Sequence, residues 1–246
     1  MKKLFIAFIA LMMTIIFVLF HYLNKFDKYA SAQCSDVNVI KVESISMVAS
    51  DGPVNNGHEY IDLGLSVKWA TCNVGANSPE GYGDYFAWGE TQPKSTYDWS
   101  TYKWCNGSYN NLTKYCTRSD YGRVDNRTRL EKNDDAARMN WGGSWRMPTR
   151  IELNELLNNC TWTWTTQNGV NGYKVTSKSN GNSIFLPAAG LISNSSFFFK
   201  VGSNGYYWSS SLDGDNSAYS LHFSSDSMKR DHNERCKGCS VRLVCP

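Results

Sequence analysis

The feature that most constrains this chain is a series of short alternating segments that follows Cys160. Two tryptophans alternate with threonines over residues 161–166, and Asn-Gly pairs at 168–169, 171–172 and 180–181 separate the segments beyond them. Period-two alternation interrupted by Asn-Gly pairs is typical of antiparallel strands joined by tight turns. The strands expected from this pattern cover residues 184–187, 206–208, 218–223 and 240–244.

Two helices are expected ahead of these strands. The first covers about residues 134–140 and ends at a Gly-Gly pair, which is a natural stop for a helix. The second begins at Thr149, which forms a capping box with Glu152. Its apolar side chains fall at the spacing of one helical face: Leu153, Leu156, Leu157 and Cys160. With further strands expected at 60–65 and 67–70, the order of elements predicts an α+β domain.

The N-terminus carries the clearest signal for location. Two lysines precede an apolar run over residues 4–20, and an Ala-Ser-Ala triplet ending at residue 32 matches the pattern that signal peptidase cleaves. Both a secretory signal and a membrane anchor would place the domain outside the cytosol. The expected division of the chain is a signal peptide or N-terminal membrane anchor at 1–32, a polar linker at 33–57 and a domain at 58–246.

Eight cysteines, an even number, agree with export, because disulfides persist in oxidising compartments. Cys105 and Cys116 flank a turn-rich segment and are expected to form one bridge. Cys236 and Cys239 form a Cys-x-x-Cys motif, which is also compatible with a redox or zinc site. This motif precedes an expected strand, whereas a thioredoxin-type cysteine needs a helix N-terminus to lower its pKa. A structural disulfide between Cys236 and Cys239 is therefore expected.

Charge and composition narrow the class of partner. The formal net charge is +3 and no run of basic residues occurs, so nucleic acid is not an expected partner. Aromatic residues make up 14% of the chain and stand among many glycines, asparagines and serines. That mixture suits short strands and a recognition surface of rigid aromatic contacts.

Six blocks of sequence resemble a known family in order and in spacing. The chain is similar to the Fibrobacter succinogenes major paralogous domain over roughly residues 58–246. The blocks are YIDLGLSVKWATCNVGA (60–76), GDYFAWGE (83–90), WGGSWRMPT (141–149), IFLPAAG (184–190), GYYWSSS (205–211) and SVRLVC (240–245).

This resemblance implies a C-type-lectin-like or formylglycine-generating-enzyme-like fold in an exported bacterial protein. The expected fold class is therefore an α+β, C-type-lectin-like domain in which two helices pack on short antiparallel sheets with long loops. In such a fold the first and last strands pair, which would bring residues 67–70 beside 241–244. The calcium and sugar motif of animal C-type lectins is absent, as is the motif around the catalytic cysteines of formylglycine-generating enzymes. Neither activity is implied.

A ligand-binding surface is expected in the loops between residues 203 and 235, which are rich in Tyr, Asn, Ser, Asp and His. Ordinary solvated loops are the alternative. An Asp-Gly-Asp-Asn run at 213–216 offers clustered oxygens to calcium, although such runs are usually turns. The candidate ligand-binding residues are Tyr207, Asp213, Asp215, Asn216, Tyr219, His222, Asp226, Arg230, Asp231, His232 and Asn233.

The sequence thus predicts an exported bacterial cell-surface binding or adhesion protein that recognises a protein or glycan on a host or bacterial surface. No catalytic motif, metal site or cofactor is expected, and the membrane is met only through the N-terminal segment. Two alternatives stay open. One is a formylglycine-generating-like enzyme that uses a thiol such as Cys236 or Cys239, and the other is a structural surface or fimbrial subunit without a soluble ligand.

Overall fold

The structure is a computed structural model that describes residues 52–194 and 197–246. The expected signal peptide or anchor at 1–32, and most of the expected linker, lie outside the described residues. The described end of that linker already contains a short strand, since Val54–Asn55 pairs with His58–Ile61. None of the helices in the described ranges is long and apolar enough to span a bilayer.

Strands dominate the domain. They hold 41% of the residues against 10% in helices, so the expected α+β class with helices packed on the sheets is wrong and the domain is mostly β. The strands are β1 (Val54–Asn55), β2 (His58–Ile61), β3 (Lys68–Asn73), β4 (Cys160–Gln167), β5 (Val170–Ser177), β6 (Ser183–Pro187), β7 (Leu191–Ser193), β8 (Phe197–Phe199), β9 (Asn204–Gly214), β10 (Ser217–Ser224), β11 (Ser227–Glu234) and β12 (Arg242–Cys245).

The error in fold class comes mainly from the polar strand β11. Its sequence, SMKRDHNE, has no alternating apolar residues, because five of its eight residues are exposed and the other three are only half-buried. The sequence pattern therefore describes it as loop, although its backbone pairs with β10 along its full length. The short strands β7 and β8 likewise carry too few residues to give a period.

The two helices lie where the sequence predicts them. α2 (Ala136–Trp141) follows the single-turn η1 (Lys132–Asp134) and is capped by Asp135, whose side chain accepts from the Arg138 backbone N–H. α3 (Arg150–Asn159) begins at Thr149 with both hydrogen bonds of the capping box present. Such a box satisfies two backbone donors at the helix start, which explains why this boundary is readable from sequence alone.

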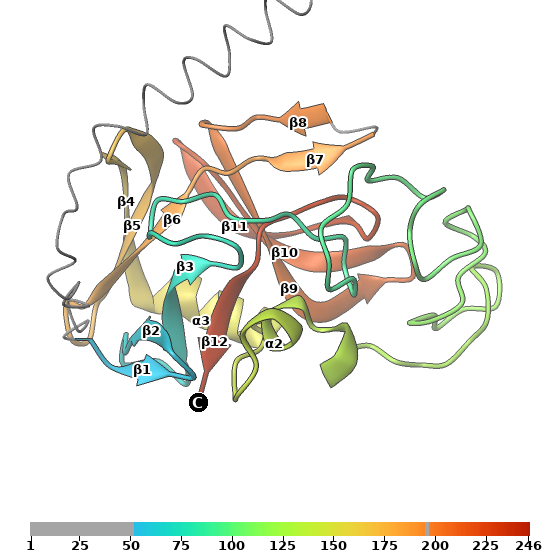
Figure 1. The fold of residues 1–246 in the computed structure, drawn as a ribbon, viewed down its shortest axis with the longest axis horizontal. Coiled ribbons are helices and arrows are strands. Elements are labelled where there is room, and N and C mark those ends of the chain that lie inside the picture. The colour runs from blue at the N-terminus through green and yellow to red at the C-terminus, as the bar shows by residue number, and fades with distance from the viewer. Residues whose placement is uncertain (1–51, 195–196) are drawn as a thin grey trace, which may run out of the picture. The chain divides into compact units, whose positions relative to one another are not determined.

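The strands form four small antiparallel sheets (Figure 1). Their orders are β1-β2-β3-β12, β11-β10-β9, β4-β5-β6 and β7-β8. The pairing expected for the first and last strands is present, because Val244 on β12 stands opposite Trp69 on β3. β12 is buried on both faces: Leu243 packs in one hydrophobic cluster and Val244 in the other.

One charged side chain is sealed into the core beside β12. Arg242 is 1% exposed and is held by neutral oxygens. Its guanidinium donates to Asn73 Oδ1 at 2.8 Å, to the Thr71 carbonyl at 2.6 Å and to the Phe185 carbonyl at 3.0 Å. Because these bonds join β12 to β3 and β6, the arginine ties two sheets together.

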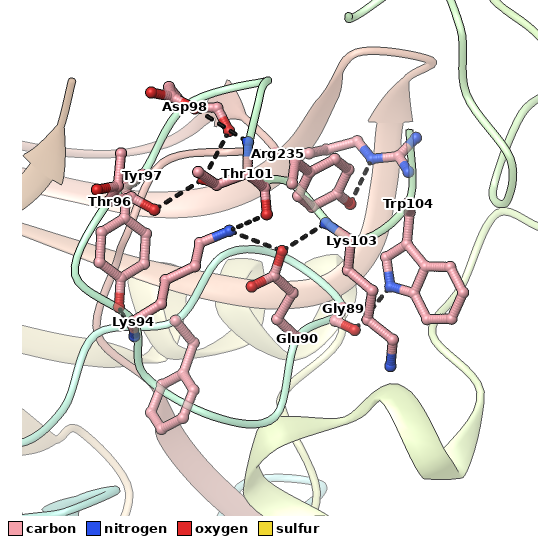
Figure 2. A network of polar contacts seen from close by, with 12 residues as sticks. Gly89, Glu90, Lys94, Thr96, Tyr97, Asp98, Thr101, Lys103, Trp104 and Arg235 are labelled. Atoms are coloured by element: carbon pink, nitrogen blue, oxygen red, sulfur yellow. Dashed lines mark hydrogen bonds and ion pairs between the residues drawn. The ribbon is translucent and has the colours of Figure 1, made fainter. Parts of the chain in front are cut away.

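A second buried arginine anchors the long loop between β3 and η1. Arg235 donates to the Lys114 and Tyr115 carbonyls at 2.9 and 2.8 Å and to the Tyr102 hydroxyl at 3.0 Å. Figure 2 shows the adjoining part of this network, in which the Glu90 carboxylate accepts from Lys94 Nζ and from the backbone N–H of residue 103, each at 2.8 Å. Hydrogen bonds donated by the buried Arg235 guanidinium therefore hold this loop in place.

Candidate functional site

The sheet β9–β11 carries different side chains on its two faces. His222 on β10 stands opposite Tyr206 on β9 and Lys229 on β11. Opposite residues of antiparallel strands share a face, and successive residues alternate between faces. The face that carries Tyr206, Ser220, His222, Lys229, Asp231 and Asn233 is called the His222 face below.

His222 lies at the centre of this face and is neutral. Its ring stacks on Tyr206 with the centroids 4.5 Å apart and the planes at 19°. Nε2 lies 2.9 Å from the side-chain amide nitrogen of Asn204, so Nε2 accepts and Nδ1 carries the proton. Nδ1 is 3.6 Å from the Asp231 carboxylate, too far for a hydrogen bond, and has no hydrogen-bond partner in the described part of the chain. Burial lowers the pKa of His222 and outweighs the opposing effect of Asp231.

Charged and amide groups surround this imidazole. Lys229 Nζ lies 3.0 Å from the Asp231 carboxylate. Burial works in the opposite direction, but the hydrogen bond from Lys229 and its charge lower the pKa of Asp231, so this carboxyl is ionised at neutral pH. Asn233 donates through its amide to Ser220 Oγ at 2.9 Å. The face therefore offers a fixed carboxylate and an oriented amide.

A pocket of about 410 Å³ opens between the His222 face and the β7–β8 hairpin. The hairpin is held in place by a reciprocal pair of backbone hydrogen bonds between Ile192 and Gly238, at 2.8 and 2.9 Å. Side chains from both elements, and from the segment after β11, line the pocket. They are Leu191, Ser193, Asn194, Phe199, Tyr206, Asn233 and Lys237.

The groups that line the pocket are suited to non-covalent binding of a small ligand. Leu191, Phe199 and Tyr206 supply apolar and aromatic surface, while two amides, a hydroxyl and an ammonium supply donors and acceptors. A concave site of a few hundred Å³ with a few convergent polar groups is typical of small-ligand binding. None of the lining groups is a nucleophile held beside a general base.

The structure places part of the predicted ligand surface on the His222 face. His222, Asp231 and Asn233 all belong to it. Asn216 and Asp226 do not, because they lie in the turns before and after β10, at opposite ends of that strand. The predicted residues thus do not form one continuous surface.

Four other predicted residues lie on the opposite face of the sheet. The Arg230 guanidinium stands 5.0 Å from the centre of the Tyr219 ring. Nδ1 of His232 stands 3.4 Å from the Asp213 carboxylate. The sheet separates this group from the pocket.

Two of the predicted ligand residues, Tyr207 and Asp215, have buried side chains in the structure. Tyr207 is 1% exposed, and its hydroxyl donates to the Pro187 carbonyl at 2.6 Å. Burial raises the pKa of Tyr207 to about 12. Asp215 is 5% exposed, and its carboxylate accepts from the backbone N–H and hydroxyl of Thr117. Both side chains serve packing and loop anchoring.

Neither of the two predicted disulfides is present in the described part of the structure. All seven described cysteines, including Cys105, Cys116, Cys236 and Cys239, are free thiols. Cys105 Sγ donates to the Trp99 carbonyl at 3.0 Å, and Cys116 Sγ donates to a different backbone carbonyl at 3.1 Å. The four thiols are buried among aromatic and aliphatic side chains, so they act as small apolar residues.

The Asp-Gly-Asp-Asn run does not gather ligands for a cation. Its two carboxylates are engaged elsewhere, one by Thr117 and the other by His232. In the ranges that the structure describes, no group of three or more His, Cys, Asp and Glu side chains is placed to hold a metal ion.

Sequence reasoning chooses Tyr207 and misses its neighbour Tyr206, which lines the pocket. In a Tyr-Tyr-Trp run the pattern does not show which tyrosine faces the core, and a shift of one residue exchanges the two. Phe199 is missed as well. A run of three phenylalanines at 197–199 is the available signal, because two of them, Phe198 and Phe199, are exposed to 56% and 39%.

Comparison with known proteins adds one match. The chain is similar to a domain of unknown function, DUF8237, over residues 164–244. The matched segment runs from β4 to β12 and contains every residue that lines the pocket. No curated protein and no solved structure matches the chain.

Proposed function

We propose that this protein is a recognition protein without catalytic activity, which binds carbohydrate in the pocket between the His222 face and the β7–β8 hairpin. The observation that carries the proposal is the lining of that pocket. Phe199 and Tyr206 offer aromatic surface, and Asn194, Asn233 and Lys237 offer hydrogen bonds from separate segments. Sugars present apolar C–H surface, which packs on aromatic rings, and many hydroxyls, which hydrogen-bond to amide and ammonium groups. The pocket supplies partners for both kinds of surface.

A carbohydrate fits this site better than a protein partner. The pocket is concave and measures about 410 Å³, which is within the range of small-ligand sites. Protein partners are usually met by broader surfaces of 20 to 30 residues a side. Phe199 lines the pocket and is 39% exposed, so its ring would be open to contact with a longer glycan.

The thiol-enzyme alternative has little support in the geometry. Cys236 is 3% exposed and Cys239 is fully buried. Burial raises the pKa of Cys236 to about 12 and raises that of Cys239 further. The reactive form of a cysteine is the thiolate, which both groups would lack at neutral pH.

Export to the cell surface is part of the proposal. Its support is the lysine pair, the apolar run and the Ala-Ser-Ala triplet within residues 1–32. The described cysteines form no disulfides, so their number adds no support for export. The N-terminal pattern therefore carries the location alone.

An array of neutral and charged glycans, probed with the full chain, tests this function. Phe199→Ala removes an aromatic wall of the pocket, and we expect it to weaken binding about five-fold, since an aromatic contact contributes roughly 1 kcal/mol. Phe198→Ala is the matched control, because Phe198 is the next residue on β8 but does not line the pocket. Equal losses in both variants would overturn the site, and the absence of any bound glycan would overturn carbohydrate binding.

A further inference from the structure

Two further cavities lie next to the segment before α2. One measures about 770 Å³ and the next about 460 Å³, and Arg129 lines both. Neighbouring residues of β9, Ser210 and Ser211, also line one each. The two cavities therefore adjoin and form one cleft between the 128–133 segment, β9 and the starts of α2 and α3.

Cations outnumber anions in this cleft. Five basic side chains line it against two carboxylates, Glu131 and Asp135. The five are Arg129, Lys132, Arg138, Arg146 and Arg150. Seven of the ten arginines in the chain fall between residues 118 and 150, so the positive charge is concentrated in this part of the sequence.

Both carboxylates are already engaged. Glu131 pairs with Lys114 at 2.5 Å and with Arg127 at 3.2 Å, neither of which lines the cleft. Asp135 is 6% exposed and accepts backbone hydrogen bonds at the start of α2 and from Met147. Neither carboxylate is therefore available to neutralise the arginines.

Most of the cations lack a carboxylate partner. Arg146 is paired with Glu152 at 2.6 Å. Among the residues that the structure describes, no carboxylate pairs with Arg129, Lys132, Arg138 or Arg150. Like charges held close together repel one another, so such a cluster favours an anionic ligand.

We infer that this cleft binds a linear anionic polysaccharide, one that carries carboxylate or sulfate groups along its length. Guanidinium groups recognise both anions through paired N–H donors. Two adjoining cavities that share Arg129 suit a chain with repeated charges. This site is independent of the pocket on the His222 face.

The backbone around the cleft argues against an acidic peptide. Peptides commonly bind by adding a strand to a free sheet edge. Here the edge of β9 is occupied, because Leu130 N–H donates to the Ser210 carbonyl and Leu212 N–H to the Thr128 carbonyl, each at 2.9 Å. Recognition in this cleft is left to side chains, which suits charged groups on a polysaccharide.

The cleft does not offer the free aromatic surface on which the bases of a single-stranded nucleic acid would stack. Tyr219 is the aromatic residue that lines the cleft. The guanidinium groups of Arg150 and Arg230 lie 5.4 and 5.0 Å from the centre of its ring. A base would have to displace them to stack there.

The test compares dextran sulfate and polygalacturonate with uncharged dextran, by calorimetric titration of the full chain. We expect both charged polymers to bind and dextran not to bind. The double variant Arg129→Gln/Lys132→Gln should weaken binding about ten-fold or more, because charged hydrogen bonds are lost. Both side chains are exposed and make no hydrogen bond or ion pair within the described ranges, so folding should be unaffected.

Arg123→Gln/Lys174→Gln is the matched control, since it removes one exposed arginine and one exposed lysine that do not line the cleft. We expect it to bind as the unaltered chain does. An equal loss in this control would show attraction by net charge alone and would overturn the site. Tighter binding of poly-glutamate would favour an acidic peptide, and no binding of either charged polymer would overturn the inference. Phe199→Ala should leave this binding unchanged, which separates failure here from failure of the pocket.

Discussion

At the scale of single residues, Arg242 shows how a buried charge can be held without a carboxylate partner among the described residues. Its guanidinium donates to oxygens on two strands, Asn73 Oδ1 on β3 and the Phe185 carbonyl on β6 among them. Burial lowers its pKa, but an arginine remains charged at neutral pH. The charge is stabilised by several hydrogen bonds to carbonyl and amide oxygens.

Arg242→Leu should therefore lower the free energy of unfolding by about 3 kcal/mol or more, because buried carbonyls lose their donors. Arg123→Leu, at an exposed site, should change it by less than about 0.5 kcal/mol. Urea unfolding of both variants measures the difference. Similar midpoints would contradict the role given to Arg242.

His222 makes stability depend on pH. Its folded pKa lies below the ordinary value because of burial, so the unfolded chain binds its proton more readily. The contribution of His222 is complete above the unfolded pKa and is lost as the pH falls through it toward the folded value. His222→Gln should therefore flatten the dependence of unfolding free energy on pH between about 7 and 5. An unchanged slope in that variant would contradict the neutral, buried state of the ring.

At the scale of elements, packing in the β9–β11 sheet depends on a glycine opposite an aromatic ring. Gly205 on β9 faces Phe223 on β10, and a Cβ at position 205 would lie between 2.1 and 2.6 Å from the ring carbons. Gly205→Ala should thus lower the unfolding free energy by about 1 to 3 kcal/mol through overpacking. Gly214→Ala is the control on the same strand, where the nearest contact is an ordinary 3.4 Å.

A second substitution checks the cause. Phe223→Leu makes room, so the double variant Gly205→Ala/Phe223→Leu should be more stable than the sum of the two single losses. Simple additivity in denaturant unfolding would show that the ring is not the obstacle.

Elements with local signals are predictable from this sequence, and elements without them are not. The start of α3 follows from Thr149 and Glu152, because a capping box involves residues three apart. β11 has no such signal, since its strand is defined by pairing with β10 and its side chains are polar. The pocket could not be predicted for two reasons. The strands β7 and β8 are too short to show a period, and the sequence does not tell which of two adjacent tyrosines, Tyr206 or Tyr207, faces the pocket.

At the scale of the whole molecule, the cysteines are components of the core. Burial raises the pKa of the six buried thiols, and only Cys72 among the described cysteines is half-exposed. In the folded full chain, iodoacetamide should therefore modify Cys72 first among these seven. Unfolding without a reductant should make all seven reactive, as followed by peptide mass spectrometry. Recovery of a cross-linked Cys105–Cys116 or Cys236–Cys239 peptide would contradict the free thiols.

Long-range contacts explain why part of the fold could not be predicted from the sequence. The loop from β3 to η1 is fixed by Arg235 and by Asp215, both of which follow it by about a hundred residues. No local pattern marks these partners, because each is about a hundred residues away along the chain. The strands near both ends of the domain follow from their own sequence patterns, but the pairing of β3 with β12 is predicted only through the family resemblance.

Hydrogen exchange of the full chain, with and without the glycan that binds most strongly on the array, tests the central claim most directly. The account predicts slower exchange in peptides that cover β7–β8 and residues 229–237, which surround the pocket. Peptides that cover the cleft at 128–133 should be unchanged by a neutral glycan. Protection at the cleft alone, or no protection around the pocket, would contradict the proposed binding site.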